Sequence, residues 1–224
     1  MPKMLSKLGA VLMVAMIVAW VGSWVPLASA ASKKAPAPVP QTGQTQCFNA
    51  SGAPITCTGT GQDGEIQPGV AWPTPRFTDN HNGTVTDNLT GLIWLQNPFC
   101  STLSPVDWLT AFAHAQSLAQ GQCGLTDGSK AGDWRVPTVK ELLSLIDDEF
   151  AFPALANAAG TGQATDGNPF ALDNLGTGSG DFWSSTTSVS HPSEVWVLEV
   201  DIGAIAEFPK EGILSYLWPV RGSQ

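Results

Sequence analysis

The sequence predicts an α+β fold with an antiparallel sheet, and three observations lead to this class. Strand patterns stand first at residues 76–96, two helical patterns follow between 104 and 147, and strand patterns return at 181–222. Strands that are grouped along the chain, apart from the helices, favour antiparallel pairing over alternating β-α-β units. The expected order is therefore strands, two helices, a long loop and strands.

The first strands are predicted within residues 76–96. Turn residues stand at Asn82-Gly83 and again from Asn88 to Gly91, and β-branched or aromatic residues flank both turns, in Thr84–Thr86 and Leu92–Leu95. The same stretch holds four oxygen-bearing side chains that calcium could use: Asp79, Asn80, Asn82 and Asp87. Their order does not match an EF-hand loop. Hairpin turn chemistry is the favoured explanation.

The first helix is predicted over residues 104–121. Ser104 is a suitable N-cap, and Pro105 suits the first helical position. Trp108, Phe112 and Ala115 recur at helical spacing, so they give the helix one face to bury.

The second helix is predicted to begin at a capping box formed by Thr138 and Glu141. The Thr138 hydroxyl should accept from the Glu141 amide, while the Glu141 carboxylate accepts from the Thr138 amide. Because Pro137 excludes helical backbone just before it, Arg135 and Val136 are expected to be extended. The stretch therefore predicts a strand-to-helix junction, with Arg135 buried and paired with a carboxylate such as Glu141 or Asp133.

Three acidic residues follow this helix and form a candidate cation site. They are Asp147, Asp148 and Glu149. Acidic groups at a helix C-terminus oppose the helix dipole, which keeps a metal role open. A solvated helix end is the alternative, and no cofactor or resident metal is predicted.

The last third of the domain is predicted as a long loop followed by strands. Residues 151–181 are dominated by Ala, Gly, Asn, Asp and Thr, and strand patterns follow at 181–187, 194–208 and 216–222, with a turn near Gly203. Trp183 stands beside the Gly-rich loop. It is the tryptophan predicted to be exposed and the candidate platform for a sugar face. Trp94, Trp108 and Trp196 fit regular patterns and are predicted to lie in the core.

Residues 1–30 have the pattern of a removable signal peptide. Lys3 and Lys7 supply positive charge, an apolar run extends from 8 to 26, and Ala28-Ser29-Ala30 supplies small residues for cleavage. A membrane anchor is the alternative, because the run approaches the ~20 residues that span a bilayer. The protein is expected to be secreted, periplasmic or on the cell surface, with no integral membrane association after signal removal.

The four cysteines are predicted to form two disulfides, because an exported protein meets an oxidising compartment. Cys47 with Cys57 and Cys100 with Cys123 are the preferred local pairings, although four cysteines allow three connectivities. Zinc is the alternative, but CxxC spacing is missing and the histidines are scattered.

Composition divides the exported chain into two parts. Residues 31–71 are rich in Pro, Gly, Thr, Gln and Ser and predict an extended linker, which can contain a small disulfide loop. Residues 72–224 form the predicted domain, which holds six Lys or Arg against seventeen Asp or Glu, a net charge of −11. That charge disfavours nucleic acid as a partner. A glycan or another surface protein is the expected partner, and the oligomeric state is left open.

Four phrases of the sequence stand out together: TVTDNLTGLIWLQ (84–96), GDWRVPTVKELLSLID (132–147), FWSSTT (182–187) and WPVRG (218–222). In this order they resemble one family of exported bacterial domains, named for the C-terminal domain of the Legionella collagen-like adhesin. The family is more distantly similar to the formylglycine-generating enzyme and C-type lectin fold. That similarity implies two helices around a twisted antiparallel sheet. It also implies a structural motif that holds the helix entrance against the sheet, carried by Trp94, Asp133, Trp134, Arg135, Pro137, Thr138, Glu141 and Arg221.

The function implied by the resemblance is recognition rather than catalysis. The family's named member is a surface adhesin that recognises sulfated glycans, whereas the acidity of this domain argues against a polyanion. Formylglycine enzymes use a late cysteine pair, and no cysteine follows Cys123 here. A non-enzymatic adhesion domain that binds a glycan or a surface protein is therefore expected. The alternatives are a structural component of the envelope or matrix, or an oxidoreductase or hydrolase on the same fold.

Overall fold

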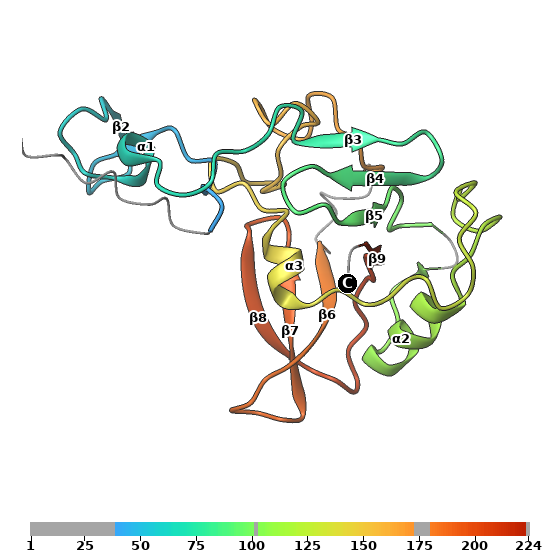
Figure 1. Ribbon diagram of the computed structural model, residues 1–224. Coiled ribbons are helices and arrows are strands. Elements are labelled where there is room, and N and C mark those ends of the chain that lie inside the picture. The colour runs from blue at the N-terminus through green and yellow to red at the C-terminus, as the bar shows by residue number, and fades with distance from the viewer. Residues whose placement is uncertain (1–38, 101–102, 173–179, 223–224) are drawn as a thin grey trace, which may run out of the picture. The chain divides into compact units, whose positions relative to one another are not determined.

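The computed structural model describes residues 39–100, 103–172 and 180–222 (Figure 1). The predicted signal peptide, residues 1–30, lies outside these ranges and stays a prediction. All the described residues belong to one compact unit. Within the described ranges, no helix is long and apolar enough to cross a membrane.

A four-stranded antiparallel sheet is built in the order β3-β4-β5-β9. Its strands are β3 (Phe77–Asp79), β4 (Thr84–Asp87), β5 (Ile93–Leu95) and β9 (Val220–Arg221). The turn at Gly83, between β3 and β4, needs glycine because its φ is 84° and a Cβ would lie 2.5 Å from the Gly124 carbonyl oxygen. β9 pairs with β5, placing Arg221 opposite Ile93. Residues far apart in sequence thus complete this sheet.

A separate three-stranded antiparallel sheet follows the order β6-β7-β8. Its strands are β6 (Asp181–Thr187), β7 (Glu194–Glu199) and β8 (Ala204–Pro209). The predicted hairpin around Gly203 is confirmed, since β7 and β8 pair from Glu194–Pro209 to Glu199–Ala204. The α+β class therefore agrees with the structure. The strands form separate sheets, where the resemblance implied one.

Three helices occur in the described residues: α1 (Asp63–Ile66), α2 (Trp108–Ser117) and α3 (Val139–Leu143). The predicted start of α2 at Ser104 is wrong. Val106 instead forms an isolated antiparallel bridge with Ser215, and Asp107 caps the helix by accepting from the Thr110 amide at 2.9 Å. The bridge with Ser215 thus holds Val106 outside the helix, which begins only after Asp107.

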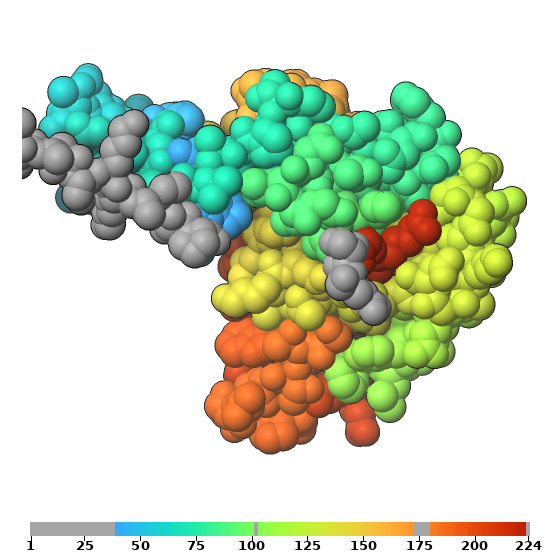
Figure 2. Space-filling model, in the orientation of Figure 1, coloured from blue at the N-terminus to red at the C-terminus, as the bar shows by residue number. Residues whose placement is uncertain are grey.

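Two hydrophobic clusters hold these elements together. The first joins Trp94, Trp218, Phe182 and Leu142, and the second joins Trp134 and Trp183 to the buried face of α2. On the face shown in Figure 2, residues of the α3 region lie between those of β3–β5 and those of β6–β8. The loop predicted over 151–181 contributes Ala154, Phe170 and Leu172 to the first cluster, so its described part is packed.

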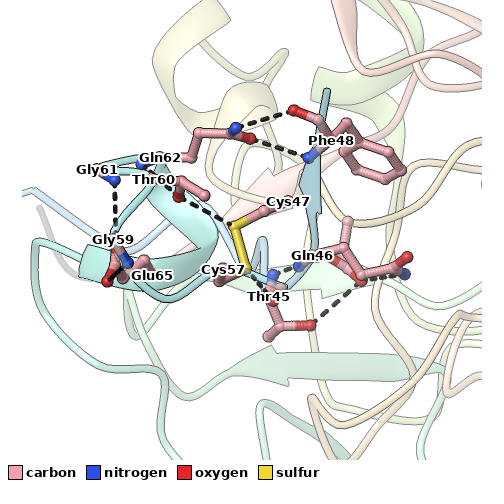
Figure 3. The surroundings of a disulfide bond; sticks show 11 residues. Thr45, Gln46, Cys47, Phe48, Cys57, Gly59, Thr60, Gly61, Gln62 and Glu65 are labelled. Carbon is pink, nitrogen blue, oxygen red and sulfur yellow. Dashed lines mark hydrogen bonds between the residues drawn. A yellow bond between two sulfur atoms is a disulfide. The ribbon is translucent and has the colours of Figure 1, made fainter. Parts of the chain in front are cut away.

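Both predicted disulfides are present, Cys47–Cys57 and Cys100–Cys123. Around the first, β1 (Cys47–Phe48) pairs with β2 (Pro54–Ile55) in a two-stranded sheet. Figure 3 shows the Gln62 side chain hydrogen-bonded to the Phe48 backbone, with N–O distances of 3.0 and 2.9 Å. Glu65 accepts from the amides of Gly59 and Gly61. From residue 39 on, the predicted linker 31–71 thus contains a stapled, hydrogen-bonded loop.

Candidate functional site

A groove of about 750 Å³ opens at the strand-to-helix junction of residues 132–138. Helix α2 contributes Phe112 and Gln116 to its lining, β6 contributes Ser185, and β9 contributes Arg221. Six of the eight residues in the predicted structural motif also line it: Asp133, Trp134, Arg135, Thr138, Glu141 and Arg221. The stretch therefore combines a structural role with the wall of a groove.

The capping box at the start of α3 is confirmed. The Thr138 hydroxyl accepts from the Glu141 amide at 3.3 Å, and Glu141 Oε2 accepts from the Thr138 amide at 2.8 Å. The predicted extended entry is also confirmed, because Arg135 and Val220 exchange two backbone hydrogen bonds of 3.1 Å. These contacts fix the junction against β9 on one side and α3 on the other.

Arg135 forms the predicted ion pair with Glu141 at the edge of the groove. Its Nη1 donates to Oε2 at 2.8 Å and its Nη2 donates to Oε1 at 2.5 Å. The expected burial of Arg135 is wrong, since its side chain is 37% exposed. Asp133 is not its partner and instead accepts from the Lys130 amide at 2.8 Å. The Arg135 side chain therefore stays accessible to a ligand.

The contact between Arg135 and Glu141 stabilises the charged form of each side chain. Hydrogen bonding to Glu141 raises the pKa of Arg135. Burial alone would raise the pKa of Glu141, but hydrogen bonds from Arg135 and Thr138 outweigh it and bring that pKa below its ordinary value. Glu141 is thus an ionised acceptor near neutral pH.

Trp134 also lines the groove, and its side chain is buried. The Arg221 guanidinium lies 5.0 Å from the centroid of this indole, and its Nη2 lies 2.7 Å from Oδ2 of the buried Asp127. Arg221, rather than Arg135, is therefore the cation that stacks on Trp134. Each arginine of the groove has a carboxylate partner.

The other two residues of the predicted motif, Trp94 and Pro137, do not line the groove. The Pro137 carbonyl accepts from the Ser185 amide at 2.7 Å, which attaches β6 to the junction. Trp94 is fully buried and packs edge-to-face on Trp218 with ring centroids 5.8 Å apart.

Comparison with known families identifies the family to which the chain belongs. Residues 83–221 match the model of the Lcl C-terminal domain, a span that includes every lining residue of the groove except Gly222. The chain belongs to the Lcl C-terminal domain family. The predicted resemblance is therefore confirmed, and the chain is adhesin-related. A search of curated proteins found no match. The more distant relation to the formylglycine-generating enzyme and C-type lectin fold stays a prediction.

In this Lcl C-terminal domain, Trp183 is not the exposed platform that the sequence predicted. The side chain is fully buried, and its Nε1 donates to the Val106 carbonyl at 2.7 Å. The Gly-rich loop ends before β6, and pairing with β7 directs both Phe182 and Trp183 into the core clusters. Trp196, predicted to be buried, is instead half-buried, and so is Trp108.

Acidic residues 148 and 149 form hydrogen bonds with residues 42–46, which precede the part of the chain that matches the Lcl C-terminal domain. Glu149 Oε2 accepts from the amides of Thr45 at 2.7 Å and Gln46 at 3.2 Å, and the Asp148 amide donates to the Thr42 carbonyl at 2.9 Å. Within the described part of the chain, the three carboxylates of residues 147–149 are not grouped closely enough to share an ion. The candidate cation site is therefore corrected to an attachment site for residues 42–46.

Asp147, one of these three acidic residues, should make the stability of the protein depend on pH. Burial raises its pKa from 3.8 to about 6, so the folded state binds a proton more tightly than the unfolded state. This contribution to stability is complete below pH 4 and is lost as the pH rises to about 6. Asp147→Asn, which mimics the protonated form, should raise the free energy of unfolding by on the order of 1–3 kcal/mol at pH 7.5.

The measurement is urea unfolding of both proteins at pH 4 and pH 7.5, with Asp166→Asn as an exposed control. The gain from Asp147→Asn should shrink at pH 4, while the control should change little at either pH. A loss of stability at pH 7.5 would instead show that attraction between Asp147 and Arg76 outweighs the cost of burial.

Gln116 and Ser185 are groove residues that the sequence did not single out. Helix α2 was recognised by its apolar face, whereas Gln116 is an exposed residue of the same helix. Ser185 lies in the FWSSTT phrase, which carried only the resemblance. No local pattern connects either residue to Arg135, because the connection is made by tertiary contacts.

Proposed function

We propose that this Lcl C-terminal domain is an exported, non-enzymatic recognition domain that binds a glycan in the groove at residues 132–141. The supporting observation is the groove itself, in which an accessible arginine–glutamate pair is fixed by backbone pairing and a capping box. Preorganised polar groups favour binding because little side-chain entropy is lost when a ligand arrives. Both disulfides fit an oxidising, extracytoplasmic compartment.

The mixture of donors and acceptors fits sugar hydroxyls. Two of the Arg135 nitrogens donate to Glu141, which leaves further N–H groups on a partly exposed guanidinium. Gln116 offers an amide that both donates and accepts, and Ser185 offers a hydroxyl oxygen that can accept, because its hydrogen is donated to the Pro137 carbonyl at 3.1 Å. Since a sugar hydroxyl both donates and accepts, such a surface can satisfy several of them at once. Phe112 adds apolar surface to the wall.

The charges of the groove support a neutral ligand over a sulfated one. Arg135 is paired with Glu141 and Arg221 with Asp127, so neither guanidinium is left without a counter-charge. Asp133 adds a further negative charge to the lining. A polyanion would have to compete with these carboxylates and approach a domain that is acidic as a whole. We therefore favour a neutral glycan.

The state of Glu141 supports recognition over hydrolysis. A general acid needs a pKa near the working pH, whereas the contacts with Arg135 and Thr138 keep the pKa of Glu141 below its ordinary value. The side chain therefore accepts hydrogen bonds and is poorly suited to deliver a proton. The hydrolase and oxidoreductase alternatives gain no support from this geometry.

A pair of tryptophan substitutions on α2 tests the groove. Gln116→Trp places an indole into the groove, whereas Ser117→Trp places the same side chain at the next exposed position, outside the lining. The tag-free protein and both variants are applied to an array of neutral and sulfated glycans. Gln116→Trp should reduce binding to a neutral glycan at least tenfold, and Ser117→Trp should leave it unchanged.

The outcomes separate the candidate functions. Equal binding by both variants would place the ligand elsewhere, and binding restricted to sulfated glycans would overturn the neutral assignment. If the parent protein binds no glycan, a screen for surface-protein partners follows. Failure of both would favour a structural role in the envelope or matrix.

A further inference from the structure

We propose that His191, Glu194 and Glu207 form a binding site for a divalent metal ion of the first transition row, such as Zn²⁺. The ligand atoms of these three side chains all lie within 4.8 Å of one another. His191 comes from the β6–β7 connection, Glu194 is the first residue of β7, and Glu207 lies on β8. None of the three lines the groove of the proposed function.

The spacing of the three ligands suits a small ion. His191 Nδ1 lies 2.8 Å from Glu207 Oε2 and 4.0 Å from Glu194 Oε2. Zinc bonds of about 2.0–2.2 Å in tetrahedral geometry place neighbouring ligand atoms ~3.4 Å apart. The two observed distances fall on either side of this value, and all three ligand atoms lie within 4.8 Å of one another, so modest side-chain rotations would bring them onto one ion.

The residues around the cluster already orient two of its ligands. Glu207 Oε1, the oxygen not facing His191, accepts from the hydroxyls of Ser188 at 2.5 Å and Ser190 at 3.3 Å. The Ser188 hydroxyl also accepts from the His191 amide at 3.2 Å. Hydrogen bonds of this kind to a metal-binding carboxylate fix its orientation and strengthen binding.

The backbone fixes the loop that carries the histidine. The Glu194 amide donates to the His191 carbonyl at 2.8 Å, and the Ser188 amide donates to the Glu194 carbonyl at 3.0 Å. Directly after His191, the Pro192 carbonyl accepts from the Lys210 Nζ at 2.9 Å. The three ligands therefore arrive from segments that are already connected, so an ion would order few additional residues.

The donor set indicates the class of ion. One imidazole nitrogen with two carboxylates suits Zn²⁺ and its neighbours in the first transition row, whereas Ca²⁺ and Mg²⁺ prefer oxygen ligands alone. The His191 side chain is 61% exposed, which leaves room for a water molecule to complete the coordination.

A simple ion pair between histidine and glutamate is the competing explanation, and the chain contains a matched control for it. His81 Nδ1 lies 3.5 Å from Asp79 Oδ2 on the exposed β3–β4 turn. In the described ranges this pair is not part of a three-ligand group. A single histidine–carboxylate contact should bind zinc much more weakly than the triad.

The test is calorimetric titration of the tag-free protein with Zn²⁺ in a buffer that does not chelate metal. The parent protein and His81→Ala should each bind one ion through the triad with the same affinity. His191→Ala and Glu207→Gln should bind at least tenfold more weakly, because each loses a ligand. Zinc should raise the melting temperature of the first two proteins more than that of the other two.

Three results would overturn the site. They are no zinc binding by the parent protein, unchanged affinity in His191→Ala, or equally tight binding of Ca²⁺. If Glu207→Gln does not fold, the exposed His191→Ala decides the question, and circular dichroism of that variant checks its fold. Glycan binding by His191→Ala, measured in parallel, tests independently whether the groove is intact.

Discussion

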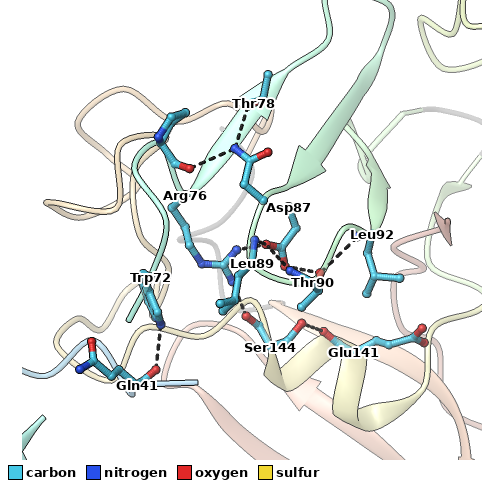
Figure 4. A network of polar contacts seen from close by, with 12 residues as sticks. Gln41, Trp72, Arg76, Thr78, Asp87, Leu89, Thr90, Leu92, Glu141 and Ser144 are labelled. Carbon is cyan, nitrogen blue, oxygen red and sulfur yellow. Dashed lines mark hydrogen bonds and ion pairs between the residues drawn. The ribbon is translucent and has the colours of Figure 1, made fainter. Parts of the chain in front are cut away.

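Replacing Asp87 with alanine is expected to lower the free energy of unfolding by about 3–5 kcal/mol, because it leaves a buried arginine without its counter-charge. Arg76 and Asp87 form an ion pair with both side chains fully buried (Figure 4). Burial lowers the pKa of Arg76, and attraction to Asp87 opposes that change. The substitution removes the opposing interaction and leaves the cost of burial.

Asp87→Ala should lower the free energy of unfolding by more than the loss of one contact, because Arg76 and Asp87 also bond to neighbouring groups. Asp87 also accepts from the Leu89 amide at 2.8 Å and from the Thr90 hydroxyl at 2.7 Å. Arg76 donates to the Ser144 carbonyl at 2.6 Å, just after α3. The pair therefore joins the four-stranded sheet to the end of α3, and its loss should weaken both.

Chemical unfolding followed by circular dichroism measures this effect, with Asp166→Ala as the exposed control. The control should change the free energy of unfolding by less than about 0.5 kcal/mol. The double variant Arg76→Met with Asp87→Leu should regain part of the loss, because apolar residues avoid the cost of burying charge. A loss below about 1 kcal/mol in Asp87→Ala would show that water reaches the Arg76 guanidinium.

Trp183→Ala is expected to destabilise the domain by about 3–5 kcal/mol through the cavity that it leaves. The indole is fully buried and packs against the Phe208 ring with centroids 6.4 Å apart. Its loss also leaves the Val106 carbonyl, 2.7 Å from Nε1, without that donor. Because Trp183 does not line the groove, any loss of glycan binding should follow loss of folding.

Trp196→Ala is the matched control, since this half-buried indole lies on the neighbouring strand β7. Trp196→Ala should lower the free energy of unfolding clearly less than Trp183→Ala does in the same measurement. Trp183→Phe should fall between the two, because it keeps an aromatic ring but loses the N–H donor. A native melting temperature with lost glycan binding in Trp183→Ala would restore its predicted role as a platform.

Local sequence signals predicted the parts of the fold that depend on neighbouring residues. The capping box of Thr138 and Glu141 is fully local, so three residues of spacing were enough to identify it. The Gly203 hairpin and the two disulfides close short loops in the same way. Each of these predictions is confirmed.

Features that depend on contacts between residues far apart in the chain could not be predicted from the sequence. Arg76 contacts Asp87 within one hairpin, but its burial depends on Ser144 and Trp72. The Gly-rich residues before Trp183 predict an exposed side chain, but pairing of β6 with β7 places that side chain in the core. The groove likewise needs α2, β6 and β9 to meet at Arg135, and no periodicity within one segment can predict that meeting.

The pairing of β9 with β5 and with Arg135 also constrains the order in which the chain can fold. Val220 lies opposite Trp94 and exchanges hydrogen bonds with Arg135. A chain that has left the ribosome only as far as Tyr216 therefore lacks both contacts. Contacts between residues so far apart in sequence are slow to form. Both the four-stranded sheet and the groove can be completed only after residue 221 has left the ribosome, so a shorter nascent chain lacks the proposed binding site.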